Sequence, residues 1–172
     1  MKKLLLVVDY QNDFVDGALG FLDAVKIYPN VKEKILNYEK NNDDVIFTSD
    51  THKEDYMDTI EGKSLPIKHC IEGSEGHKFY KDINDLASHH LVLKKDTYPC
   101  VKLFSALKGS EYESIEVIGV VTNICVLSNA VILKSLFPNT PIIVDSKCCA
   151  SNNKKLEEEA YDILRNLAII VK

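Results

Sequence analysis

The sequence predicts an α/β fold: a single doubly wound sheet of about six mainly parallel strands, with helices on both faces. Short apolar runs alternate with longer stretches of helical periodicity, which is typical of parallel sheets. The short runs are rich in β-branched residues and apolar throughout, as expected for strands whose two faces are both covered. The length of 172 residues fits one domain, spanning residues 1–172.

Six apolar runs are predicted to be strands. In chain order these are Leu4–Val8, Val45–Thr48, Leu91–Leu93, Ile115–Val121, Ile142–Val144 and Ala168–Val171. Five further stretches have helical spacing: Val31–Lys40, Phe79–Leu86, Leu103–Lys108, Asn123–Leu136 and Lys154–Asn166. In the last helix we expect one apolar stripe, formed by Leu156, Ala160, Ile163, Leu164 and Leu167.

Residues 50–76 interrupt this alternation. The segment is rich in His, Asp, Glu and Gly and has little periodicity. Because long irregular loops are uncommon inside compact domains, such a loop is either functional or disordered.

Composition and charge exclude several classes of protein. The net charge of −5, with lysines scattered among acids, argues against binding to nucleic acid. The apolar run Leu4–Val8 is closed by Asp9 and is too short for a secretory signal or a membrane span, so we expect a cytoplasmic protein without a membrane partner. The five cysteines lack paired metal-site spacing and, being odd in number, do not suggest a disulfide framework. Whether the chain forms a homo-oligomer stays open.

Polar residues follow four of the predicted strands. Asp9 follows the first, Asp50 and His52 the second, Lys95 the third and Cys125 the fourth. Each alone has an ordinary explanation, such as a turn cap, a solvated lysine or a packed thiol. Because ligands gather at the carboxyl ends of parallel strands, their convergence on one edge favours a site.

An acid, a lysine and a thiol together suit acyl transfer. The thiolate is the attacking species, and a helix N-terminus or a nearby lysine stabilises it. A carboxylate can accept the thiol proton and later deliver it to a leaving amine. Main-chain N–H groups at the helix start can hold the developing oxyanion. The set Asp9, Lys95 and Cys125 is therefore a workable catalytic triad without histidine.

The loop also contains a candidate metal site. Asp50 and His52 are two residues apart, so an extended segment can direct both at one ion, and His69 could complete the set. Asp55 and Glu61 are further oxygen donors in the loop. Imidazole and carboxylate ligands suit Zn²⁺, with Fe or Mn as alternatives. Polar residues also populate ordinary surface loops, so the pair alone decides nothing.

Five segments, in this order and spacing, resemble one known family. They are "VVDYQNDF", "TSDTH", "LPIKHC", "LKKDTY" and "GVVTNICV". The chain resembles the nicotinamidase branch of the isochorismatase-like cysteine hydrolases from Leu4 to about Ala150. The resemblance implies a hydrolase of linear amide C–N bonds, most specifically of nicotinamide to nicotinate and ammonia, with a place in NAD salvage.

The resemblance also implies roles for single residues. Asp9 would accept and donate the proton, Lys95 would be the triad lysine, and Cys125 would be the nucleophile. A cis peptide is implied between Val120 and Val121, and the N–H groups of Val121 and Cys125 would form the oxyanion hole.

The implied metal ligands are Asp50, His52 and His69. Many nicotinamidases have a second histidine four residues after the first, where this chain has Tyr56. Glu61 is expected to replace that ligand, with a water as the alternative.

The implied substrate contacts come from Phe14, Leu65, Val120 and Tyr98. Leu65 lies roughly where many relatives have a tryptophan, a residue that this chain lacks. Outside the matching segments, His77, His89 and His90 are expected on the surface.

Two other functions remain open at this point. A metal-free amidase of the same fold would act on a carbamoyl or ureido compound, but the Asp50, His52 and His69 set would then have no purpose. A non-catalytic binding module would be suggested by a missing triad member, and none is missing.

Overall fold

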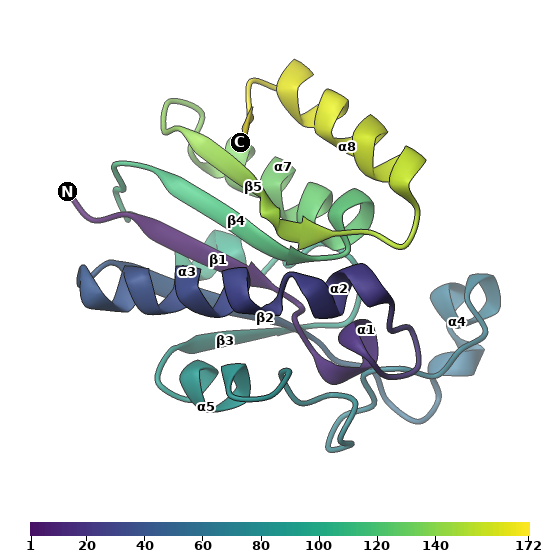
Figure 1. Cartoon of the computed structure of the whole chain (residues 1–172). Coiled ribbons are helices and arrows are strands. Elements are labelled where there is room, and N and C mark those ends of the chain that lie inside the picture. The colour runs from purple at the N-terminus through teal and green to yellow at the C-terminus, as the bar shows by residue number, and fades with distance from the viewer.

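The computed structural model describes residues 1–172 and contains one sheet of six strands (Figure 1). The strands are β1 Leu4–Val8, β2 Asp44–Asp50, β3 Leu91–Lys95, β4 Ile115–Val120, β5 Ile142–Ala150 and β6 Ile170–Val171. Their order across the sheet is β3-β2-β1-β4-β5-β6, and every neighbouring pair is parallel. The predicted fold class is confirmed.

Helices cover both faces of this sheet (Figure 1). They are α1 Asn12–Val15, α2 Leu22–Lys26, α3 Tyr28–Lys40, α4 Ile60–Ser64, α5 Ile83–Ala87, α6 Leu103–Ala106, α7 Leu127–Leu136 and α8 Lys154–Asn166. A 3₁₀ turn, η1 Tyr56–Asp58, precedes α4, and a π-helical turn, η2 Thr122–Val126, precedes α7. No helix combines the length and the apolar character needed to cross a membrane.

The central strand β1 explains why the apolar runs do not alternate with polar residues. Leu5 and Val7 point to the core beneath α2, α3 and α5. Leu4, Leu6 and Val8 point to the opposite core, beneath α6, α7 and α8. All five side chains are inaccessible to solvent. An apolar residue is therefore favoured at every position of a strand with two covered faces.

Strands β1 and β4 approach each other closely at one point. Gly119 of β4 has a φ of +119°, in the region that favours glycine, and lies opposite Val8. A Cβ at this position would lie 2.1 Å from the Val8 carbonyl oxygen. Only glycine fits at this close contact, which lies directly before the carboxyl ends of both strands.

The predicted stripe of α8 is partly wrong. Leu156, Ile163 and Leu167 are 42–49% exposed, while Glu157 is buried. The helix is rotated so that Glu157 faces inward, where its carboxylate accepts a hydrogen bond from the Thr122 hydroxyl at 3.0 Å. Sequence periodicity missed this because a buried carboxylate is stable only with such a partner, and the partner lies far away in the chain.

Other differences concern element boundaries. The strand predicted over Ile142–Val144 continues to Ala150. The register between β4 and β5 shifts between Val117 and Gly119, so the two strands pair again after the polar residues of β5. The helices α1 and α2 were not predicted, since four or five residues carry too little periodicity. The loop of residues 50–76 contains η1 and α4, and is an ordered structure.

Candidate active site

The carboxyl ends of the central strands bring the predicted triad together. Asp9 follows β1, Lys95 ends β3, and Cys125 lies in η2 directly after β4. The Lys95 Nζ atom lies 2.7 Å from Asp9 Oδ2 and 3.6 Å from Cys125 Sγ. It also lies 2.9 Å from Oδ1 of Asp50, the last residue of β2. One lysine ammonium therefore contacts the acid, the thiol and a predicted metal ligand.

Asp9 has one oxygen available for proton transfer. The residue is fully buried and has a φ of +47°, which is uncommon outside glycine. Its Oδ1 accepts a hydrogen bond from the Thr48 hydroxyl at 2.7 Å. Its Oδ2 touches the Lys95 ammonium but receives no aligned hydrogen bond. The Lys95 ammonium is therefore the only partner of Oδ2, which leaves this oxygen as the candidate for proton transfer.

The electrostatics of the triad favour a resting thiol and a strong base. Burial raises the pKa of Asp9, against the opposing effect of the Lys95 ammonium. Burial also raises the pKa of the Cys125 thiol well above its ordinary value, and the pull of Lys95 only partly offsets this. The Lys95 pKa is raised despite burial, because Asp9, Cys125 and Asp50 surround it. If Cys125 is the nucleophile, as predicted, it would need a carboxylate to accept its proton.

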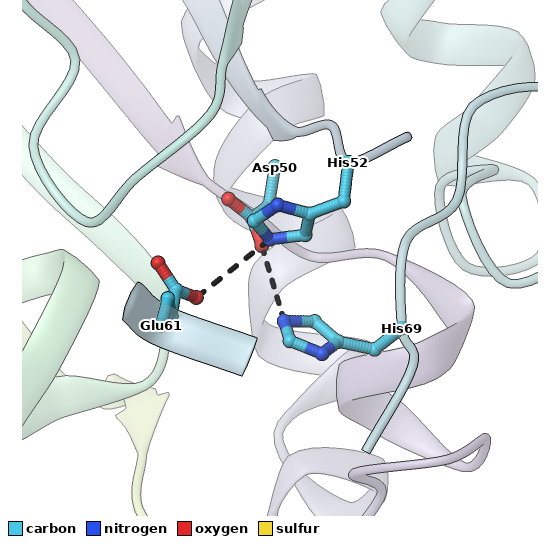
Figure 2. Close-up of side chains that lie close together, drawn as sticks. All are labelled: Asp50, His52, Glu61 and His69. Carbon is cyan, nitrogen blue, oxygen red and sulfur yellow. Dashed lines mark hydrogen bonds and ion pairs between the residues drawn. The ribbon is translucent and has the colours of Figure 1, made fainter. Parts of the chain in front are cut away.

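The predicted metal ligands also lie together. Figure 2 shows the side chains of Asp50, His52, Glu61 and His69 pointing toward one point. Their candidate donor atoms all lie within 4.8 Å of one another. His52 Nε2 is 2.9 Å from Asp50 Oδ2 and 3.7 Å from Glu61 Oε1, and His69 Nε2 is 3.5 Å from Asp50 Oδ2.

Local structure aims each of these donors. The Nδ1 of His69 donates to the Ile67 carbonyl at 2.8 Å, which leaves Nε2 facing the other ligands. Thr59 caps α4 by accepting from the Gly62 N–H at 2.9 Å, and Glu61 in this first turn is thereby directed at the site.

Tyr56 occupies the position of the missing histidine and packs instead of ligating. Its hydroxyl donates to the Leu65 carbonyl at 3.0 Å. Its ring lies 4.6 Å from the ring of His52 and 5.0 Å from that of His69, measured between centroids. Tyr56 therefore packs against both imidazoles, and Glu61 lies in the cluster as the fourth candidate donor.

The donor set fits a divalent metal. A tetrahedral zinc with bonds of roughly 2.0–2.1 Å would separate its ligand atoms by about 3.4 Å. Three of the donor separations, from 2.9 to 3.7 Å, bracket this value, and every pair of donors lies within 4.8 Å. Burial, together with the Asp50 carboxylate, raises the pKa of Glu61. A cation would relieve this environment, in which a part-buried carboxylate ionises reluctantly beside a second carboxylate.

Two residues of the first loop support this cluster. The side-chain amide of Gln11 pairs with the main chain of Asp50: it accepts from the N–H at 2.8 Å and donates to the carbonyl at 2.9 Å. Asp13 Oδ2 accepts from the Cys70 N–H at 2.7 Å, next to His69. Gln11 and Asp13 thus hold in place the segments that carry Asp50 and His69.

The prediction that His77 is a surface residue is wrong. His77 is half-buried, and its Nε2 lies 2.9 Å from the Thr51 hydroxyl. Its carbonyl accepts a second hydrogen bond from Gln11 at 2.8 Å. His77 therefore supports the segment after β2, a role that no sequence pattern indicated.

A cavity of about 170 Å³ opens beside Cys125 and the metal cluster. Most of its lining is apolar. The lining residues are Phe14, Leu19, Phe21, Asp50, Glu61, Leu65, His69, Tyr98, Val121, Ile124, Cys125 and Asn152. Phe14, Leu65 and Tyr98 were predicted to contact substrate and are found here. Leu19, Phe21, Ile124 and Asn152 were not predicted, because nothing in the local pattern distinguishes them from core or loop residues.

Val120 is not among the residues that line this cavity, and its predicted substrate contact stays a prediction. It is fully buried in the core beneath α3, as the last residue of β4. The peptide between Val120 and Val121 is cis, as expected, and Val121 rather than Val120 reaches the cavity.

The fold and this set of side chains define a class of α/β hydrolases. The chain belongs to the isochorismatase family: the Isochorismatase domain matches residues 3–172. PncA, an isochorismatase family protein of Bacillus subtilis, is 31% identical over 170 residues, which cover 90% of each chain.

Solved structures agree with this assignment. A pyrazinamidase/nicotinamidase from Streptococcus mutans has a TM-score of 0.89 and 27% identity, covering 99% of this chain and 100% of its own. A pyrazinamidase of Pyrococcus horikoshii, solved in complex with zinc, has the same fold, with a TM-score of 0.85 and 24% identity over 100% of this chain and 99% of its own. Family and fold together confirm the prediction of a hydrolase that acts on an amide bond.

Proposed function

We propose that the chain is a nicotinamidase, a cysteine amidohydrolase that converts nicotinamide and water to nicotinate and ammonia. One observation carries this proposal: the same apolar cavity is lined by Cys125 at one place and by Asp50, Glu61 and His69 at another. A flat aromatic amide fits such a cavity, with its carboxamide at the thiol and a ring nitrogen at the metal ligands.

Acylation begins at the Cys125 thiol. Its proton passes to Asp9 Oδ2, and the sulfur attacks the carboxamide carbon to form a tetrahedral intermediate. The N–H groups of Val121 and Cys125 stabilise the oxyanion. Asp9 then gives its proton to the amino group as the C–N bond breaks, which releases ammonia and leaves a thioester on Cys125.

Deacylation reverses these roles. Asp9 accepts a proton from a water molecule as that water attacks the thioester carbonyl. When the C–S bond breaks, the proton returns to Cys125 and nicotinate leaves. The Lys95 ammonium keeps Asp9 in place through both half-reactions and balances the charge of the buried carboxylates.

Asp50, His52, Glu61 and His69 would hold a divalent metal. Two imidazoles and two carboxylates suit Zn²⁺ best among common metals, with Fe or Mn as alternatives. When bound, the metal supplies a Lewis acid that anchors the pyridine nitrogen. Phe14, whose ring packs edge-on to His69 with centroids 5.4 Å apart, would bound one side of the substrate ring.

Ammonia release from a panel of amides tests the substrate. Nicotinamide should be hydrolysed faster than aliphatic amides or ureido acids. Cys125→Ala should lower turnover by at least about 10³-fold, because it removes the nucleophile. Cys148→Ala is the matched control, since this buried thiol lies outside the cavity. Preference for a ureido acid would instead favour a carbamoyl amidase.

Metal content tests the second half of the proposal. The purified protein should contain about one divalent metal per chain, and His52→Ala should lose it. His90→Ala is the control, because His90 pairs with Glu39 and not with the cluster. Full activity toward nicotinamide in a metal-free preparation would refute the anchoring role.

A further inference from the structure

Asn129 is a fully buried polar residue in α7, one helical turn after Cys125. Its Nδ2 donates to the Cys125 carbonyl at 2.8 Å and to the Tyr98 carbonyl at 3.2 Å. Its Oδ1 accepts from the Cys100 N–H at 2.8 Å. Both ends of the amide are satisfied, and all three partners are main-chain groups.

These bonds join two parts of the site. The Tyr98 side chain lines the cavity, in the segment that follows Lys95 and β3. Apart from the bond between Asn129 Nδ2 and the Tyr98 carbonyl, residues 96–99 form no hydrogen bond with another part of the protein. Asn129 is therefore the hydrogen-bonding anchor of the cavity wall, and it bonds to the nucleophile residue at the same time.

The position itself is unusual for an asparagine. Leu133 and Val126 lie on the same face of the helix and are fully buried in the apolar core. Asparagine is a weaker helix former than leucine, and its burial is tolerated only when the amide is hydrogen-bonded. Such a break in local pattern is expected at functional sites rather than in ordinary packing.

We propose that Asn129 is a positioning residue that holds the Tyr98 wall and Cys125 in a fixed relative geometry. The inference rests on the proposed roles of Cys125 as nucleophile and of Tyr98 as cavity wall. Asn129 touches no reacting atom. It acts through its three main-chain partners, and a small displacement between thiol and substrate is costly because attack requires close approach.

Two substitutions separate the two halves of this role. Asn129→Ser retains a hydroxyl that can bond to the Cys125 carbonyl four residues earlier, but it is too short for the Tyr98 segment. It should raise the KM for the amide while leaving Cys125 reactivity near that of the native protein. Asn129→Ala loses all three bonds, so it should raise KM and also lower kcat, each on the order of tenfold.

Leu133→Ala is the matched control, because it opens a cavity one turn further along the same helix, away from the site. It should lower the Tm at least as much as Asn129→Ala, with KM and kcat within about twofold of the native values. Equal kinetic changes in Leu133→Ala and Asn129→Ala, at equal loss of Tm, would overturn the inference.

Labelling of Cys125 by iodoacetamide, quantified by mass spectrometry of its peptide, needs no substrate. Its rate should change in Asn129→Ala and not in Leu133→Ala or Asn129→Ser. If Cys125→Ala keeps full turnover, the proposed function fails. If Cys125→Ala is inactive while Asn129→Ala and Asn129→Ser match Leu133→Ala in kinetics and labelling, only the inference fails. Should Asn129→Ala not fold, the KM of Asn129→Ser decides alone.

Discussion

Lys34 and Lys95 each lie between two carboxylates, but the two groups differ in burial and in their other neighbours. Lys34 of α3 contacts Glu116 and Asp145, both at 2.7 Å. Glu116 also accepts from the Tyr38 hydroxyl at 2.8 Å and pairs with Lys172 at 2.8 Å. With the main-chain N–H of residue 147 donating to Asp145 Oδ1, every carboxylate oxygen in this network has a donor.

Lys95 has the same kind of surroundings but an incomplete set of bonds. It lies between Asp9 and Asp50, and its side chain is 2% exposed, against 20% for Lys34. Asp9 Oδ2 lacks an aligned donor, and Asp9 has a left-handed backbone. The comparison teaches that a buried ion pair alone does not mark a catalytic site. What sets the Lys95 group apart is the Cys125 thiol, which lies 3.6 Å from Lys95 Nζ and lines the cavity.

The largest expected effect comes from Lys95→Met. This change leaves Asp9 and Asp50 buried without a cation, so the free energy of unfolding should fall by about 3–5 kcal/mol. Turnover should fall at least about 10³-fold, since Asp9 loses the charge that positions it. Urea unfolding and ammonia release measure the two effects. Turnover above a tenth of the native value would contradict the role of Lys95.

Lys34→Met should have a smaller effect, confined to stability. Glu116 and Asp145 would each lose a charged donor, which should cost about 2 kcal/mol. Tyr38 and Lys172 still bond to Glu116, and the network does not line the substrate cavity. The kcat should stay within twofold. A kcat loss as large as that of Lys95→Met would break the distinction between the two networks.

The smallest expected effect is a loss of folding stability at acidic pH. Although burial opposes it, the hydrogen bond from Lys34 holds the pKa of Asp145 below its ordinary value of 3.8. A carboxylate with a lowered folded-state pKa stabilises the protein above its ordinary pKa, and this stability is lost as the pH falls through the lowered value. Compared with Asp145→Asn, the native protein should be more stable by about 1 kcal/mol at neutral pH.

This advantage should shrink below about pH 4, where Asp145 takes up its proton. Urea unfolding of both proteins between pH 3 and 7 would measure it. An advantage that grows toward pH 3 would mean that Asp145 is not held ionised by Lys34.

The sequence was sufficient to bring the candidate catalytic side chains to one place, for a simple geometric reason. Every parallel strand ends at the same edge, so Asp9, Asp50, Lys95 and Cys125 had to converge once their strands were recognised. The second network could not be predicted in this way. Glu116 lies inside a strand, and its partners on α3 and β5 depend on tertiary packing.

The other differences between prediction and structure also arise from tertiary packing. Val120 and Val121 are adjacent and chemically identical, and only the path of the chain sends the second into the cavity. Glu157, and not Leu156, lies on the buried face of α8, where the Thr122 hydroxyl donates to its carboxylate. Asn129, by contrast, left a trace in the sequence: a polar residue stands at a core position of a predicted helix.

The close contact at Gly119 has a consequence for how the sequence can diverge. Gly119 bears no reactive group, yet a methyl group there would push β4 away from Val8, which directly precedes Asp9. In a library of every single-residue replacement selected for function, position 119 should tolerate fewer replacements than most positions lining the cavity. The residue that does least chemistry would then be among the slowest to diverge.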